Sequence, residues 1–225
     1  MGRLALAAII VLGALGPGCA GTAEKGAWHT VERGQTLWRI ARTYRVDLQE
    51  LAEVNDIEDP AKIRAGQKIF IPGASLSITV EPYRPPAKGT PEASKAVPEV
   101  KTHKGRLGWP TQGVVTSRYG IRGDKRHDGL DIGAPAGTPI TAAAAGAVVY
   151  AEYTRGYGNM VILQHDAHLM TVYAHCQKIE VSKGNKVAKG QQIGTVGATG
   201  RASGPHLHFE VRVDRKARNP ASYLP

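Results

Sequence analysis

The amino-acid sequence predicts an all-β domain of antiparallel sheets over residues 107–225, built as a sandwich or open barrel, with a small βααβ module ahead of it at residues 28–73. Three observations lead to this prediction. From residue 107 onward, short apolar runs are broken by Gly, Pro or Asn about every 8 to 12 residues, a spacing typical of all-β domains. Residues 28–73 open and close with strand-like segments, and apolar residues recur at helical spacing between them. Residues 74–106 hold five prolines among small and charged residues, which indicates a linker.

The N-terminus has the composition of an export signal. Arg3 is followed by an apolar run from residue 4 to residue 15. A run of this length is too short to span a bilayer comfortably, so it indicates a secretion signal. We therefore expect a signal peptide at residues 1–18.

The apolar run ends with Gly-Pro-Gly before Cys19, which resembles a bacterial lipobox although its first two residues depart from the usual ones. The resemblance implies lipidation of Cys19, and residues 19–27 then form a tether; a plain signal peptide with a chance cysteine is the alternative. Ala20 is not the aspartate that retains lipoproteins in the inner membrane. The expected location is the cell envelope, with a lipid anchor in the outer membrane and the protein facing the periplasm.

The charge balance favours an anionic partner. The chain carries 29 Lys and Arg against 19 Asp and Glu, a formal net charge of +10, and nucleic acid, a membrane surface and an acidic cell wall all fit. The sequence shows no helix-turn-helix, no RNA-binding aromatic motif and no paired-cysteine finger. We expect no nucleic-acid partner.

The elements of the module at residues 28–73 follow from local patterns. A strand is expected from His29 to a turn at Gly34, and a helix follows where apolar residues recur from Leu37. Asp47 can cap a second helix by accepting from its first free amides. The apolar residues before Pro72 predict a closing strand.

The same residues match a known pattern through four segments: His29-Thr-Val, Gly34-Gln-Thr-Leu-Trp38-Arg-Ile-Ala41, Asn55, and Ile63-Arg-Ala-Gly66-Gln-Lys-Ile-Phe-Ile-Pro72. The module closely resembles a LysM module. The resemblance implies binding of glycan that contains N-acetylglucosamine, between the loops at residues 34–37 and 56–64. The candidate sugar-binding residues are Gly34, Thr36 and Ile63.

Chemistry is indicated by two histidine motifs in the all-β domain. In His206-Leu-His208-Phe-Glu210 the period of two places both imidazoles and the carboxylate on one face of a strand. In His127-Asp-Gly-Leu-Asp131, residues four apart point the same way in a strand and also converge in a helix. Two histidines and a carboxylate suit Zn²⁺, which keeps an open position when it is catalytic.

Further segments carry a resemblance to one enzyme family: His127-Asp-Gly-Leu-Asp131, Gly156-Tyr-Gly-Asn159, Tyr173-Ala-His175 and Gly204-Pro-His206-Leu-His208-Phe-Glu210. The domain resembles the lysostaphin/LytM-type zinc metallopeptidases, peptidase family M23. The resemblance implies that His127, Asp131 and His208 bind Zn²⁺ and that His175 and His206 are the catalytic pair. One imidazole would accept a proton from the attacking water and the other would stabilise the oxyanion.

Three functions remain open at this point. The complete set of ligand-type residues favours a zinc metalloendopeptidase that cuts peptidoglycan cross-links or stem peptides. The order of lipobox, LysM module, linker and M23-type domain resembles NlpD-like lipoproteins, which implies instead a non-enzymatic activator of cell-wall amidases during cell division. Glycan binding alone would leave the five metal-site and catalytic residues without a role.

Overall fold

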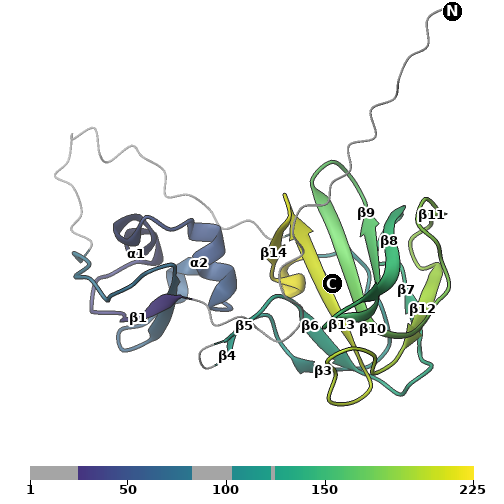
Figure 1. The fold of residues 1–225 in the computed structure, drawn as a ribbon. Helices are drawn as coiled ribbons and strands as arrows, with labels where there is room; N and C mark the ends of the chain where they lie inside the picture. The colour runs from purple at the N-terminus through teal and green to yellow at the C-terminus, as the bar shows by residue number, and fades with distance from the viewer. Residues whose placement is uncertain (1–24, 83–102, 123–124) are drawn as a thin grey trace, which may run out of the picture.

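The computed structural model describes residues 25–82, 103–122 and 125–225 (Figure 1). The expected signal peptide, the lipidation site Cys19 and the greater part of the expected linker lie outside these residues. Within them, no helix is long and apolar enough to cross a membrane.

The N-terminal module has the predicted βααβ order. Its elements are β1 (Gly26–Thr30), α1 (Leu37–Tyr44), α2 (Leu48–Val54), the 3₁₀ helix η1 (Pro60–Lys62) and β2 (Lys68–Pro72). Strands β1 and β2 pair in antiparallel fashion. The two helices bury Leu37, Ile40 and Leu51 completely in a small apolar core. That burial explains the helical spacing of these residues in the sequence.

Side-chain caps fix where both helices begin. The Thr36 hydroxyl accepts a hydrogen bond from the Arg39 amide at 3.3 Å, and the Asp47 carboxylate accepts from the Glu50 amide at 2.9 Å. Each cap satisfies an amide that has no partner inside its helix. The predicted capping role of Asp47 is confirmed.

Residues 74–82, which we expected to lie in the linker, pack against the module. Val80 is 1% exposed and belongs to the module's apolar core. Its carbonyl accepts from the Gln35 side-chain amide at 2.7 Å, and the Tyr44 hydroxyl accepts from the Ile78 amide at 2.9 Å. The module is thus completed by chain beyond its closing strand.

The C-terminal domain consists of strands joined by turns. They are β3 (Val114–Ser117), β4 (Gly120–Arg122), β5 (Lys125–His127), β6 (Leu130–Gly133), β7 (Pro139–Thr141), β8 (Gly146–Thr154), β9 (Gly158–Gln164), β10 (Leu169–Ile179), β11 (Lys186–Val187), β12 (Gln192–Val196), β13 (His206–Val213) and β14 (Lys216–Arg218), followed by the 3₁₀ helix η3 (Pro220–Ser222). The fold is all-β with antiparallel sheets, as predicted.

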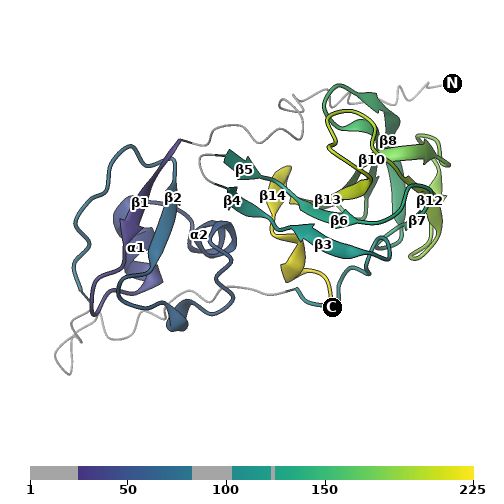
Figure 2. The same cartoon turned by 90° about the horizontal axis from the view of Figure 1, so that it is seen from below.

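One ten-stranded sheet dominates this domain (Figures 1 and 2). Its main path runs β11-β8-β9-β10-β13-β6-β3, while β12 joins β10 to β7 and β14 pairs with β13. Strands β4 and β5 form a separate hairpin. The largest apolar core lies under the sheet and includes Leu207, Phe209 and Val211 of β13. Alternate residues of β13 are therefore left for the opposite face, where the site lies.

Candidate metal centre

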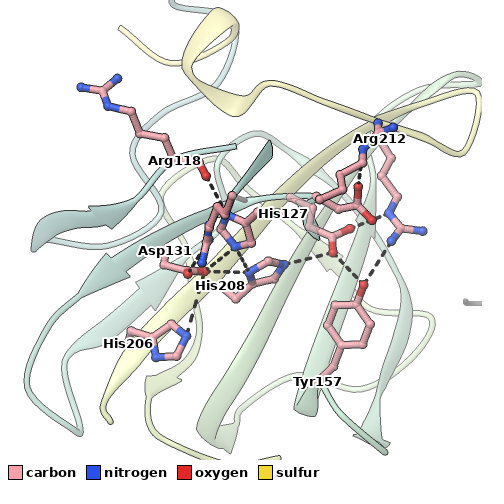
Figure 3. A network of polar contacts seen from close by, with 11 residues as sticks. Arg118, His127, Asp131, Tyr157, His206, His208 and Arg212 are labelled. Carbon is pink, nitrogen blue, oxygen red and sulfur yellow. Dashed lines mark hydrogen bonds and ion pairs between the residues drawn. The ribbon is translucent and has the colours of Figure 1, made fainter. Parts of the chain in front are cut away.

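Three side chains from different strands converge on one point. His127 ends β5, Asp131 lies in β6 and His208 lies in β13, directly across the ladder from Asp131. The Asp131 Oδ1 atom is 3.0 Å from His127 Nε2 and 2.8 Å from His208 Nδ1, and the two nitrogens are 3.2 Å apart (Figure 3). Among the described residues, this is the one cluster of His, Cys, Asp and Glu that brings three such atoms close enough to hold a metal ion.

In each of the two candidate ligand imidazoles, the outer nitrogen, which points away from Asp131, already has a hydrogen-bond partner. His127 Nδ1 lies 2.7 Å from the Arg118 carbonyl oxygen, and His208 Nε2 lies 3.1 Å from the Glu210 carboxylate. Both partners only accept, so both outer nitrogens must carry the proton. When the ring is neutral, its inner nitrogen then carries the lone pair, and in both residues this nitrogen faces the Asp131 carboxylate.

With both rings neutral, three electron-pair donors lie within 3.2 Å of one another, an arrangement that a cation between them would stabilise. In tetrahedral zinc sites with bonds of about 2.0 Å, neighbouring ligand atoms are about 3.3 Å apart. The observed triangle fits one face of such a tetrahedron. The chemistry of the donor set suits Zn²⁺, and the site residues can hold it.

Gly129 allows the ligands to approach each other. A Cβ atom on this residue would lie 2.6 Å from the Phe209 carbonyl oxygen and 2.7 Å from Cε1 of His208. Contacts that short are not found between real atoms, so β13 could not lie where it does beside any larger residue.

Glu210 supports His208 from the buried side. Its side chain is fully buried and accepts from His208, from the Tyr157 hydroxyl at 2.8 Å and from the Arg212 Nε at 2.6 Å. Burial raises the pKa of Glu210, but the donors from His208 and Arg212 outweigh burial and lower the pKa to about 2. An ionised carboxylate behind a ligand imidazole fixes its tautomer and strengthens it as a donor to metal.

Arg122 and Asp131 form an ion pair at the open side of the site. The Arg122 guanidinium lies 3.2 Å from Oδ2 of Asp131, the oxygen that does not face the imidazoles. This contact leaves Oδ1 as the inward-facing oxygen. The carboxylate orientation is thus set by the β4–β5 hairpin as well as by β6.

The other two histidines lie together beside the ligands. The ring centroids of His175 and His206 are 4.7 Å apart, and Nε2 of His206 is 4.0 Å from Asp131 Oδ1. Their Nδ1 atoms lie 2.7 Å from the Thr199 carbonyl and 2.8 Å from the Gly204 carbonyl, so each donates there. Both Nε2 atoms remain available for chemistry at the site.

His175 occupies an unusual backbone position. Its φ angle is +62°, in the left-handed region, where the pairing register of β10 with β9 shifts. Non-glycine residues rarely adopt this conformation, and it is frequent at functional sites. Burial lowers the pKa of His175 to about 4, so its imidazole is neutral at pH 7.

The five predicted site residues lie together, and the groups that hold them in place include residues that the sequence did not single out. His127, Asp131, His175, His206 and His208 form one cluster, although sequence spacing linked them only in pairs. The sequence placed Glu210 on the same face as His206 and His208, and its burial and its contact with His208 make it a support of the candidate metal site. The Arg118 and Thr199 carbonyls carry no side-chain signal, so no pattern could have found them.

The predicted sugar-binding residues have structural roles of their own. Gly34 has a φ angle of +84° in the turn after β1, Thr36 caps α1, and Ile63 packs against the module core. A part in glycan binding stays a prediction for all three.

The fold and the site define the C-terminal domain as an antiparallel β-sheet domain with a candidate metal site of two histidines and one aspartate, joined to a βααβ module. Residues 125–220 match the family model described as Peptidase family M23, and residues 29–72 match the LysM domain. The chain belongs to peptidase family M23 and carries a LysM domain.

Relatives extend this similarity to the whole chain. The chain is 39% identical to the uncharacterized lipoprotein YgeR of Escherichia coli, over 99% of this chain and 93% of that protein. It is 33% identical to the lipoprotein NlpD/LppB homolog of Pseudomonas aeruginosa, over 88% and 76% of the two chains. It is 28% identical to the murein hydrolase activator NlpD of Escherichia coli, over 89% and 68%.

Proposed function

We propose that the protein is an exported zinc metalloendopeptidase that hydrolyses peptide bonds in the cross-links or stem peptides of peptidoglycan. The observation that carries the proposal is the triangle of His127 Nε2, Asp131 Oδ1 and His208 Nδ1, whose outer partners leave all three inward electron pairs for a cation. Membership of peptidase family M23 supports peptide bonds as the target.

Three residues would hold the metal and two would handle protons. A zinc ion bound by His127, Asp131 and His208 supplies a Lewis acid that activates water and polarises the scissile carbonyl. His175 is the better candidate for the base, because burial keeps it neutral and its Nδ1 proton is bound to a carbonyl. Its Nε2 can then take a proton from the attacking water.

His206 is assigned the complementary role. Its Nδ1 donates to the Gly204 carbonyl, so its Nε2 carries a proton only when the ring is doubly protonated and cationic. When Nε2 carries that proton, it can donate to the oxygen that becomes negative as the carbonyl is attacked. His175 takes a proton and His206 offers one, at a ring separation of 4.7 Å.

The N-terminal half would bring this site to its substrate. We assign glycan binding to the LysM domain through Gly34, Thr36 and Ile63, and membrane attachment to a lipid on Cys19. Two of the relatives above have names that describe them as lipoproteins. This supports a place in the cell envelope, and we propose the outer membrane, with the protein facing the periplasm.

The test is digestion of isolated sacculi by the purified mature protein, with mass spectrometry of the released fragments. We expect muropeptides cut at a peptide bond, and their masses identify which bond. A chelator or His206→Ala should abolish release, whereas His168→Ala, on an exposed side chain far along the sheet, should leave it unchanged. Full activity of the His206→Ala protein would refute the assignment.

A second function is favoured by one specific similarity. The NlpD relative of Escherichia coli is named a murein hydrolase activator, and the chain covers 68% of it. The alternative is that this protein activates a cell-wall amidase without cutting bonds itself. Adding it to an amidase distinguishes the two, because stimulation that survives removal of zinc and His206→Ala would assign activation.

A further inference from the structure

The LysM module lies against the C-terminal domain (Figures 1 and 2). Helix α2 faces the β4–β5 hairpin and β14, and an apolar cluster joins the two domains. Val54 and Phe70 of the module pack with Tyr119, Ile121 and Ala217 of the C-terminal domain. Two modules separated by a linker thus share a small core of their own.

Polar contacts surround this cluster, and two of the groups that make them, Glu53 and Asn219, are buried. Glu53 is 5% exposed, and its Oε2 lies 3.3 Å from the Asn219 amide and 3.8 Å from the Arg218 guanidinium. The Asn219 side chain also donates to Asp56 at 3.3 Å. A carboxylate is buried at such a place only when it is paired, so Glu53 is matched to the C-terminal domain.

The main chains touch at Gly120. This residue has a φ angle of +118°, and a Cβ atom on it would lie 2.7 Å from the Val54 carbonyl oxygen. Gly120 also pairs with His127 across the hairpin. The C-terminal end of α2 therefore contacts β4, the strand that pairs with His127.

The opposite strand of the hairpin is contacted as well. The Arg126 guanidinium lies 3.8 Å from Glu50 of α2, and it donates to the Tyr119 hydroxyl at 2.8 Å. Arg126 immediately precedes His127, and Tyr119 immediately follows Arg118, whose carbonyl holds His127 Nδ1. The interface therefore contains the sequence neighbours of both His127 and Arg118.

We propose that the LysM module is a positioning element of the metal centre. Helix α2 holds the β4–β5 hairpin, and the hairpin holds His127 at the distance at which it meets Asp131 and His208. The hairpin belongs to no larger sheet in the described residues, pairing only within itself, so the module supplies the packing that the sheet does not. The claim that the hairpin positions a metal ligand rests on the proposed function. The claim that the module packs against the hairpin does not.

The test uses Glu53→Lys and Arg218→Glu in the full mature chain, each measured without metal and in zinc competition with a chromogenic chelator. Either substitution places like charges together at the buried interface, one from each side. We expect amide exchange in residues 119–122 and 125–127 to become about tenfold faster or more, because the hairpin opens without its support. Zinc affinity should fall about tenfold, as for loss of a contact that orients a ligand.

Two matched proteins make the result specific. Glu32→Lys changes the same charge on an exposed residue in the turn after β1 and should leave both readouts unchanged. Combining Glu53→Lys with Arg218→Glu restores an opposite-charge pair and should recover most of the slow exchange. Exchange within β1 and β2 should stay as in the unsubstituted chain, which shows that the module itself is folded.

The inference is overturned if the single variants leave exchange in residues 119–122 and 125–127 unchanged, or if exchange rises while zinc affinity stays the same. A failure of the proposed function looks different. In that case the unsubstituted chain would bind no zinc, and the exchange data would still decide whether the module holds the hairpin.

Discussion

The replacement Glu210→Gln tests how the buried side of the site is held. Glutamine keeps the size of the side chain but removes its charge, and its amide places two N–H groups where the carboxylate accepted. Either Arg212 or the pair of His208 and Tyr157 would then face a donor instead of an acceptor. The change replaces none of the three candidate ligand residues and no residue of the apolar core.

The expected cost follows from the pKa of Glu210. The value falls from the ordinary 4.5 to about 2 because the donors outweigh burial, and this difference corresponds to about 3 kcal/mol of stability. Since the folded-state pKa is the lower one, this contribution is present above pH 4.5 and is lost as the pH falls toward 2. The variant should lose about 3 kcal/mol at pH 7 and bind zinc about 10- to 100-fold more weakly.

Denaturant unfolding of the metal-free protein between pH 3 and pH 7, with zinc competition at pH 7, measures both effects. The unsubstituted chain should become more stable with rising pH in the lower part of this range, and the variant should show a shallower rise. Glu152→Gln, the same change on an exposed residue of β8, is the control. If Glu210→Gln unfolds like the control and binds zinc within about twofold of the unsubstituted chain, the carboxylate does not hold His208.

Three further outcomes are expected. Gly129→Ala should weaken zinc binding and lower stability by about 1–3 kcal/mol, measured by denaturant unfolding, because its Cβ would displace His208 or the Phe209 carbonyl. Zinc at 100 times its dissociation constant should raise the stability of the unsubstituted chain by about 2.7 kcal/mol in a thermal scan, and this gain should vanish in His208→Ala. Asn55→Ala should destabilise the LysM module by about 2–3 kcal/mol, seen as faster exchange in β2, because the Asn55 side chain both donates to and accepts from the Phe70 backbone.

The sequence predicted the elements that follow from local patterns. Asp47 caps the second helix of the module, and β13 alternates between core and site, as local patterns in the sequence predicted, whereas the Thr36 cap of the first helix was not predicted. The candidate metal ligands follow from local patterns too, since His-x-His and His-x-x-x-Asp each lie within one short segment, and the structure brings His127, Asp131 and His208 together. Local patterns are sufficient to predict a contact wherever its two residues are close in the sequence.

Contacts between distant segments were not predictable in this way. Glu53 lies in a helix where its position is compatible with an exposed face, and its partner Asn219 is 166 residues further on. Val80 occupies a segment whose composition indicates a linker, yet it fills the core of the module. His175 reaches the site through a register shift in β10, and a period of two cannot show where a strand changes register.

The register between β6 and β13 shows how local sequence patterns and contacts between distant segments together determine the site. His208 faces Asp131 because Leu207 and Phe209 lie opposite Ile132 and Leu130, all of them buried in the same core. A slip of one residue would turn His208 toward the core and bring Leu207 to the site, exchanging every side chain between the two faces. The apolar residues that specify the fold therefore also specify how Asp131 and His208 face each other in the candidate metal centre. His127 itself lies in a hairpin outside that sheet, and Arg122 of the same hairpin pairs with Asp131.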